Sequence, residues 1–105
     1  MIRKITKKII IHHSASSPAT TIEQIRLWHK QKGFTDAAGH SGYHYFITNK
    51  GEIIEDRPDD EWGCAVRNAN HDAVHICLAG NFNWNIPTMA QINALLKILI
   101  KLVLK

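Results

Sequence analysis

The sequence predicts a single α/β domain, residues 1–105, in which a mixed central β-sheet is flanked by helices. Two apolar runs, residues 9–11 and 74–78, are typical of strands buried on both faces. A hairpin signal lies between them, and helical periodicity follows each run. We expect the two apolar strands at the centre of the sheet and the hairpin beside them.

The first half of the chain predicts a strand followed by a helix. The strand covers residues 5–13 and leads into a small polar loop. Thr20 and Glu23 then fit a capping box, and Gly33 supplies the helix stop. Trp28 is the expected aromatic anchor of this helix on the sheet.

The second half predicts a hairpin, a long loop, a strand and a last helix. Residues 43–48 and 52–55 flank an Asn-Lys-Gly turn, which is a strong hairpin signal. Residues 57–70 show no clean period and are predicted to form a surface loop of the kind that often carries function. A buried strand is expected over residues 73–80, and Thr88 is expected to cap the final helix.

The final helix carries one narrow polar stripe and is otherwise almost entirely apolar. A helix of this kind is normally buried on most of its circumference. If part of it is exposed, the patch favours self-association. The stripe consists of Asn93, Lys97, Lys101 and Lys105.

Composition narrows the possible partners and compartments. The net charge of +4 suits an anionic partner. The sequence lacks a cluster of Lys and Arg interleaved with aromatic residues, which disfavours nucleic-acid binding. Cys64 and Cys77 make neither a disulfide framework nor a metal pair, and Cys77 is expected in the core. With no signal peptide and no bilayer-length apolar stretch, we expect a protein that is cytoplasmic as synthesised and not inserted in a membrane.

The strand end at His12 and His13 is the strongest candidate for chemistry. Neutral imidazole is a preferred zinc ligand, and strand parity lets only one of the two rings face a given site. The alternative is a pair of half-buried histidines satisfied by backbone groups. A catalytic zinc needs three protein ligands, and no short-spacing ligand motif is present. Tyr43, at the start of the hairpin, is either a donor to a developing oxyanion or an ordinary strand residue.

Five segments in order resemble the type-2 N-acetylmuramoyl-L-alanine amidases, a family that includes amidase-type phage lysozymes and the peptidoglycan recognition proteins. The match extends over most of the chain, and five ordered motifs are far more specific than one. They are Ile-Ile-Ile-His-His-Ser-Ala (9–15), Ile-Arg-Leu-Trp-His-Lys-Gln-Lys-Gly-Phe (25–34), Gly-Tyr-His-Tyr-Phe-Ile (42–47), Gly-Glu-Ile-Ile-Glu-Asp-Arg (51–57) and Asn-His-Asp-Ala-Val-His-Ile-Cys-Leu-Ala-Gly-Asn-Phe (70–82).

The resemblance implies a zinc-dependent hydrolase that cuts the amide between the lactyl group of N-acetylmuramic acid and L-alanine in peptidoglycan. It makes His12 a zinc ligand and Tyr43 the catalytic helper, which stabilises the oxyanion or assists the attacking water. Substrate contacts are expected at His13, Arg67 and Asn70. The absence of a signal peptide favours a phage or prophage endolysin that acts on the cell wall once it is released.

The chain departs from the family pattern in two places. Ala65 stands where a histidine of the substrate groove is expected. The remaining zinc ligands, a histidine and then a cysteine or aspartate, would follow the last helix together with a final strand and helix, so we expect a C-terminally incomplete domain. His75, Cys64 or a second copy of the chain could complete the metal site. The alternatives are an inactive homologue that binds muropeptides and a regulatory protein that binds an acidic partner.

Overall fold

A computed structural model describes residues 1–66 and 70–104 of the chain. These residues form one four-stranded sheet in the order β1-β4-β2-β3, accompanied by two helices. β4 pairs in parallel with β1 and β2, whereas β2 and β3 are antiparallel, which confirms the predicted mixed sheet. The elements are β1 (Lys8–His13), α1 (Ile22–Lys32), β2 (Tyr45–Ile47), β3 (Ile53–Glu55), β4 (Ala73–Leu78) and α2 (Met89–Val103).

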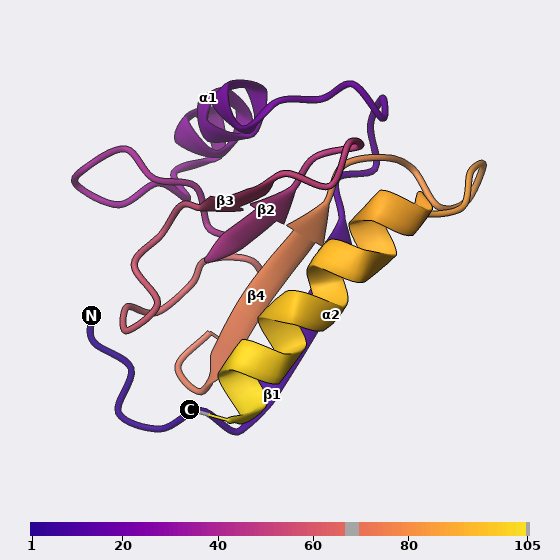
Figure 1. The fold of residues 1–105 in the computed structure, drawn as a ribbon. Helices are drawn as coiled ribbons and strands as arrows, with labels where there is room; N and C mark the ends of the chain where they lie inside the picture. Colours follow the sequence, from indigo (N-terminus) through magenta and orange to yellow (C-terminus); the bar gives the residue numbers. More distant parts are fainter. Residues whose placement is uncertain (67–69, 105) are drawn as a thin grey trace.

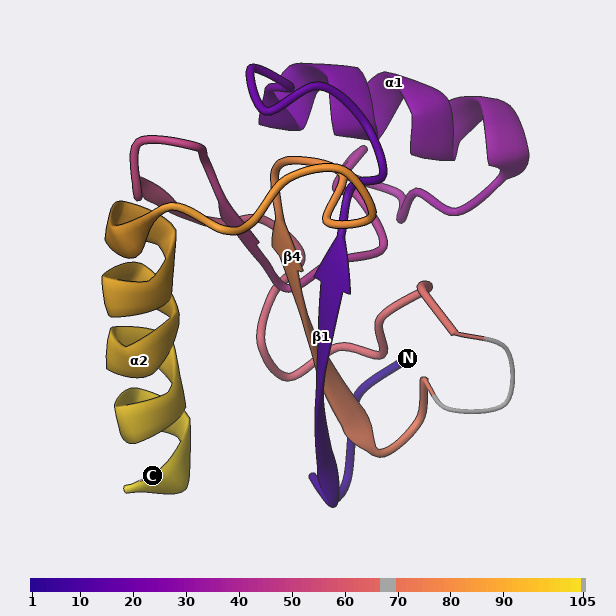
Figure 2. The ribbon, with the colours of Figure 1, turned by 90° about the vertical axis from the view of Figure 1, so that its right-hand side faces the viewer.

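The two helices belong to opposite faces of the sheet. α2 runs along the strands, whereas α1 lies across the end toward which β1 and β4 point (Figures 1 and 2). Because neighbouring side chains on a strand point to opposite faces, each strand contributes to both cores. One core joins α2 to Tyr45, Ile47, Val74, Ile76 and Leu78, and the other joins α1 to Phe46 and Cys77.

The position of β4 confirms one sequence prediction, and the position of β1 corrects another. All six residues of β4 are buried, as expected for a central strand. β1, however, is an edge strand, and Ile11 on it is 50% exposed. The β-branched run at 9–11 predicted burial on both faces, but among the described residues β1 is paired only with β4. Burial thus depends on sheet order, which the local sequence does not encode.

α1 has the predicted extent but differs in two details. Its N-cap is Thr21, which forms the capping box with Gln24, whereas Thr20 is buried and contacts a loop serine hydroxyl. Trp28 is 37% exposed and is not the predicted anchor. Ile22, Ile25 and His29 share the buried face instead, and Trp28 lies about 90° around the helix from that face at 100° per residue.

The hairpin β2–β3 and the cap of α2 at Thr88 follow the sequence prediction. α2 buries Gln91, Ala94 and Ile98. The Gln91 amide donates to the carbonyl oxygens of Ala79 (2.8 Å) and Ile47 (3.5 Å), which fastens the helix to the ends of two strands.

α2 leaves several apolar side chains exposed, which is the condition under which the sequence analysis expects self-association. Of the polar stripe, Lys105 lies outside the described residues. Within the described residues, no helix combines the length and apolarity needed to cross a bilayer. The large exposed apolar side chains of α2 and its C-cap are Met89, Ile92, Leu96, Ile100, Val103 and Leu104.

Candidate active site

His12 and His75 form the centre of the candidate site. His12 lies opposite Cys77 in the parallel β1–β4 register, and His75 precedes Cys77 by two residues, so all three side chains share the α1 face of the sheet. Nε2 of His12 lies 2.9 Å from Nδ1 of His75, a hydrogen-bond distance. His12 is partly exposed, whereas His75 is completely buried. Burial, followed by the nearby His13, lowers the pKa of His12, which keeps the ring neutral near pH 7.

His13 lies on the opposite face of the sheet, as strand parity requires. Its Nδ1 accepts a hydrogen bond from the backbone N–H of Phe82 (2.9 Å), and the two rings lie 5.6 Å apart. The imidazole therefore holds the loop between β4 and α2. The predicted substrate contact through this ring stays a prediction.

Tyr43 lies beside His12, with 5.3 Å between the ring centroids. Its ring is 5.0 Å from that of His29 on α1, so the phenol lies between the helix and the sheet. The hydroxyl shares a hydrogen bond with the Cys77 thiol. Burial is the main cause that raises the pKa of Tyr43, and burial also raises the pKa of Cys77 to about 12. Both groups stay protonated at neutral pH, and Cys77 is the core residue that the sequence predicted.

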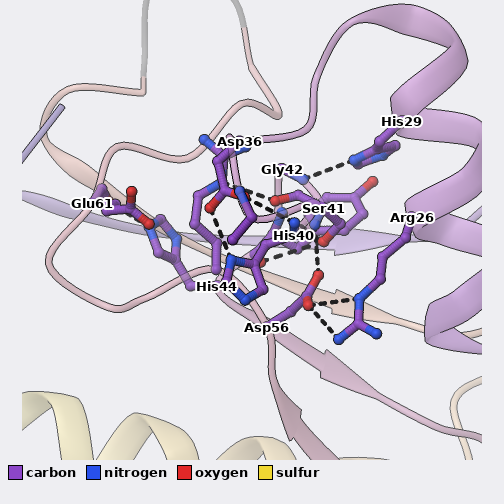
Figure 3. A network of polar contacts seen from close by, with 12 residues as sticks. Arg26, His29, Asp36, His40, Ser41, Gly42, His44, Asp56 and Glu61 are labelled. Atoms are coloured by element: carbon purple, nitrogen blue, oxygen red, sulfur yellow. Dashed lines mark hydrogen bonds and ion pairs between the residues drawn. The ribbon is translucent and has the colours of Figure 1, made fainter.

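The loop that carries Tyr43 is fixed to α1 by buried polar contacts (Figure 3). Nδ1 of His29 accepts from the backbone N–H of Gly42 at 2.8 Å. One carboxylate oxygen of Asp56 accepts from Arg26 Nε (2.9 Å) and Nη2 (2.6 Å), and the other accepts from the N–H of Ser41 (2.7 Å). The backbone N–H groups of the two residues before Tyr43 are thus each bound by a side chain, one by a carboxylate and the other by an imidazole.

Arg57 completes this support from the other side of the loop. Its guanidinium donates to the carbonyl oxygens of Ser41 (2.8 Å), Trp62 (2.8 Å) and Phe34 (2.7 Å), and the residue is 8% exposed. A buried arginine that satisfies three carbonyls ties three loops together. The sequence analysis included Arg57 in a motif but assigned it no role.

Two glycines allow the loops around the site to pack closely, one against another loop and one against the histidines. A Cβ at Gly42 would lie 2.0 Å from the carbonyl oxygen of Cys64, and one at Gly63 would lie 2.5 Å from Cδ2 of His75. On the far side of His75, the ring of His44 stacks at 5.9 Å with 8° between planes. His44 Nδ1 also accepts from the backbone N–H of His75 (3.0 Å). The imidazole of His75 is therefore tightly enclosed.

The remaining predicted residues lie on the loop between β3 and β4. Oδ1 of Asn70 accepts from the N–H groups of Ala65 and Val66, both at 3.1 Å, so it stabilises the loop. Asn70 also lines a hollow of about 490 Å³ together with Trp62, Gly63 and Cys64. Arg67 lies outside the described residues.

A second group of potential metal ligands lies elsewhere. Asp36, His40 and Glu61 bring ligand atoms within 4.8 Å of one another (Figure 3). Asp36 already accepts from the N–H groups of Ala38 and His40 and contacts Nδ1 of His40 at 2.9 Å. These contacts make Asp36 and His40 part of a loop that is held together by hydrogen bonds. No member of the group is a ligand that the resemblance predicts.

Sequence reasoning missed most of the residues that hold the site together. Asp56 and His29 were seen only as part of a motif and of a helical period, although both accept buried hydrogen bonds from the Tyr43 loop. What identifies both residues is that their acceptor atoms lie next to the backbone N–H groups of Ser41 and Gly42. That proximity arises only when α1 is packed against the sheet. The sequence analysis names His75 as a possible metal ligand, but its place beside His12 depends on the register between β1 and β4.

Comparison with known proteins places this geometry in a family. The family model described as N-acetylmuramoyl-L-alanine amidase matches residues 3–105. The chain belongs to this amidase family. It is 32% identical over 111 residues to the endolysin of Escherichia phage T7, covering 98% of this chain and 70% of that protein. It is 33% identical over 107 residues to the endolysin of Klebsiella phage KP32, covering 95% and 68%.

Solved structures of amidases and endolysins share the fold. The amidase LysC from Clostridium intestinale URNW superposes with a TM-score of 0.84 at 30% identity, covering 92% of this chain and 62% of that one. The Ph2119 endolysin of a Thermus scotoductus bacteriophage gives 0.86 at 28%, covering 98% and 68%. Drosophila peptidoglycan recognition protein SA, at 18% identity and 0.82, supports the fold alone. This amidase-family chain spans about two thirds of the length of such relatives.

The imidazole nitrogens of the site are of the type that binds zinc. Zinc in proteins is bound by neutral imidazole nitrogens, and two such nitrogens meet at 2.9 Å between β1 and β4. The lowered pKa of His12 favours the neutral form that a metal needs.

Proposed function

We propose that this amidase-family chain is a zinc-dependent N-acetylmuramoyl-L-alanine amidase that hydrolyses the lactyl–L-alanine amide of peptidoglycan. The observation that supports it most is the adjacency of His12 and Tyr43, 5.3 Å apart between ring centroids, on one face of a sheet shared with known amidases. The endolysin relatives favour a phage or prophage origin and action on the cell wall after release.

In this proposal His12 holds the zinc ion through an imidazole nitrogen. When bound, zinc supplies a Lewis acid for the scissile carbonyl and an activated water. The edge position of β1 leaves His12 partly exposed, so the ring can reach a polymeric substrate that could not enter a closed cavity.

Tyr43 acts as a hydrogen-bond donor rather than as a base. Its raised pKa keeps the hydroxyl protonated near neutral pH, and a protonated hydroxyl can donate to the oxyanion that develops on the substrate. The contacts of His29 and Asp56 with the two residues before it fix the phenol before substrate binds. Such preorganisation avoids rearrangement during the reaction.

Substrate contacts are proposed at Asn70, Arg67 and His13. Asn70 lines the hollow of about 490 Å³ beside Gly63 and Cys64, which offers room for part of a stem peptide. Ala65, in place of the expected groove histidine, presents no polar group there, so we expect weaker substrate binding than in relatives that carry the histidine.

A second candidate function is binding of muropeptides without hydrolysis. Peptidoglycan-recognition protein SC2 of Drosophila melanogaster, which is 30% identical over 81% of this chain and 48% of its own length, is a relative named for recognition.

The test is release of new L-alanine amino groups from purified peptidoglycan in the presence of zinc. We expect release by the wild type, loss with His12→Ala, and a loss of about 100-fold or more with Tyr43→Phe, the scale of a missing oxyanion donor. Lys97→Ala, on the exposed side of α2 and on the opposite face of the sheet from Tyr43, is the control and should keep full activity. Peptidoglycan binding without release would favour the recognition function, and binding only to acidic proteins would favour a regulatory one.

A further inference from the structure

We infer that His75 is a second metal ligand, so that His12 Nε2 and His75 Nδ1 together hold one divalent zinc ion between β1 and β4. The inference rests on the proposed zinc dependence and names a ligand that the family resemblance does not supply. It is carried by the 2.9 Å separation of the two nitrogens and by their approach from neighbouring strands.

The separation is close to what one metal ion requires. Two nitrogens bound at about 2.0–2.1 Å in a tetrahedral arrangement lie about 3.3 Å apart. The observed 2.9 Å means that the rings need to part by only a few tenths of an ångström to admit the ion. The hydrogen-bonding proton between the two nitrogens would move to the other nitrogen of its own ring, so that both rings stay neutral and both facing nitrogens act as electron-pair donors.

The surroundings make His75 a rigid donor and His12 an accessible one. His44 stacks on the His75 ring on one side, and Gly63 is the residue whose missing Cβ leaves room for it. The side chain of His75 therefore has little freedom to turn away. His12, at the edge of the sheet, leaves the remaining coordination positions open to a third ligand, to water and to substrate.

The position of Tyr43 agrees with a metal at this point. Its ring contacts the His12 ring on the side next to α1, and His75 lies on the central strand, two residues before the residue opposite His12. A carbonyl bound by the metal would therefore lie near the phenol. The rival site is the group of Asp36, His40 and Glu61, which must be tested separately.

The experiment measures zinc binding directly by titration calorimetry on the metal-stripped chain, with zinc ion alone as the probe. We expect one zinc per chain, and affinity lower by about tenfold or more in both His12→Asn and His75→Asn, the scale of disrupting a metal site. His40→Asn removes the rival group and His71→Asn alters an exposed histidine, so both should bind zinc as the wild type does.

Three results would overturn the inference: no zinc binding by the wild type, unchanged affinity in His75→Asn, or loss of binding in His40→Asn. If His75→Asn fails to fold, long-range ¹⁵N NMR of the wild type decides. Zinc should shift Nε2 of His12 and Nδ1 of His75 together, and a shift at His12 alone would refute the role of His75. Zinc bound at both rings without peptidoglycan hydrolysis would refute the proposed function but support this inference. Peptidoglycan hydrolysis that His75→Asn leaves unchanged would support the proposed function and refute this inference.

Discussion

Replacing Asp56 by asparagine should loosen the support of the Tyr43 loop without changing side-chain size. The carboxylate is fully buried and accepts from both Arg26 and the Ser41 N–H, whereas an asparagine amide offers only one oxygen and turns an NH₂ toward the other donor. A hydrogen bond to a charged group contributes about 1.5–3 kcal/mol, and leaving a buried donor unpaired costs a similar amount. Because the Arg26 side chain is 37% exposed, its share must be reduced for solvent screening.

We therefore expect Asp56→Asn to lower the free energy of unfolding by about 2–3 kcal/mol, which corresponds to a fall in Tm of roughly 10–20 °C for a domain of this size. Urea and thermal unfolding followed by circular dichroism measure the loss, with exposed Glu52→Gln as the matched control. In a double-mutant cycle with Arg26→Gln, the sum of the two single-mutant losses in unfolding free energy should exceed the loss in the double mutant by about 1 kcal/mol. A loss within about 0.5 kcal/mol of the wild type, or strict additivity in the cycle, would refute the assigned role.

Three further predictions concern other parts of the molecule. Burial, followed by the nearby charges of Lys32 and Arg57, lowers the pKa of His29 in the folded chain. As the pH falls, the unfolded chain therefore binds the proton first, so the free energy of unfolding should be at its full value above about pH 6.5 and decline below it. Urea unfolding at a series of pH values should show a shallower decline for His29→Asn than for the wild type. Gly63→Ala should cost about 1–3 kcal/mol by overpacking against His75, and an unchanged Tm would contradict the close approach. Sedimentation velocity should show concentration-dependent self-association that Ile100→Lys reduces and Lys97→Ala does not, whereas a wild type that stays monomeric at all concentrations would rule it out.

The elements whose signals are local were predictable from the sequence. The Asn-Lys-Gly turn, the stop at Gly33 and the cap at Thr88 each depend on a few neighbouring residues, and all three appear as expected. The capping box of α1 was displaced by one residue, because Thr20 and Thr21 are followed at the same distance by Glu23 and Gln24 respectively, and both pairs suit the motif.

Features that depend on tertiary arrangement could not be derived in this way. The exposure of Ile11 follows from the edge position of β1, and the exposure of Trp28 follows from the rotation of α1 about its axis. At the site, strand parity separated His12 from His13, but the meeting of His12 with His75 depends on the register between two distant strands. The role of Asp56 needed both α1 and the loop in place.

The parallel pairing of β1 with β4 has a consequence for folding. His12 and His75 are 63 residues apart in the chain, and everything between them, including α1 and the hairpin, must be looped out before the two rings can meet. Closing such a loop is entropically unfavourable and makes non-local strand pairing slow. Helical signal should therefore appear before the site exists, so that in a refolding experiment a probe bound between the two imidazoles would report closure of the sheet.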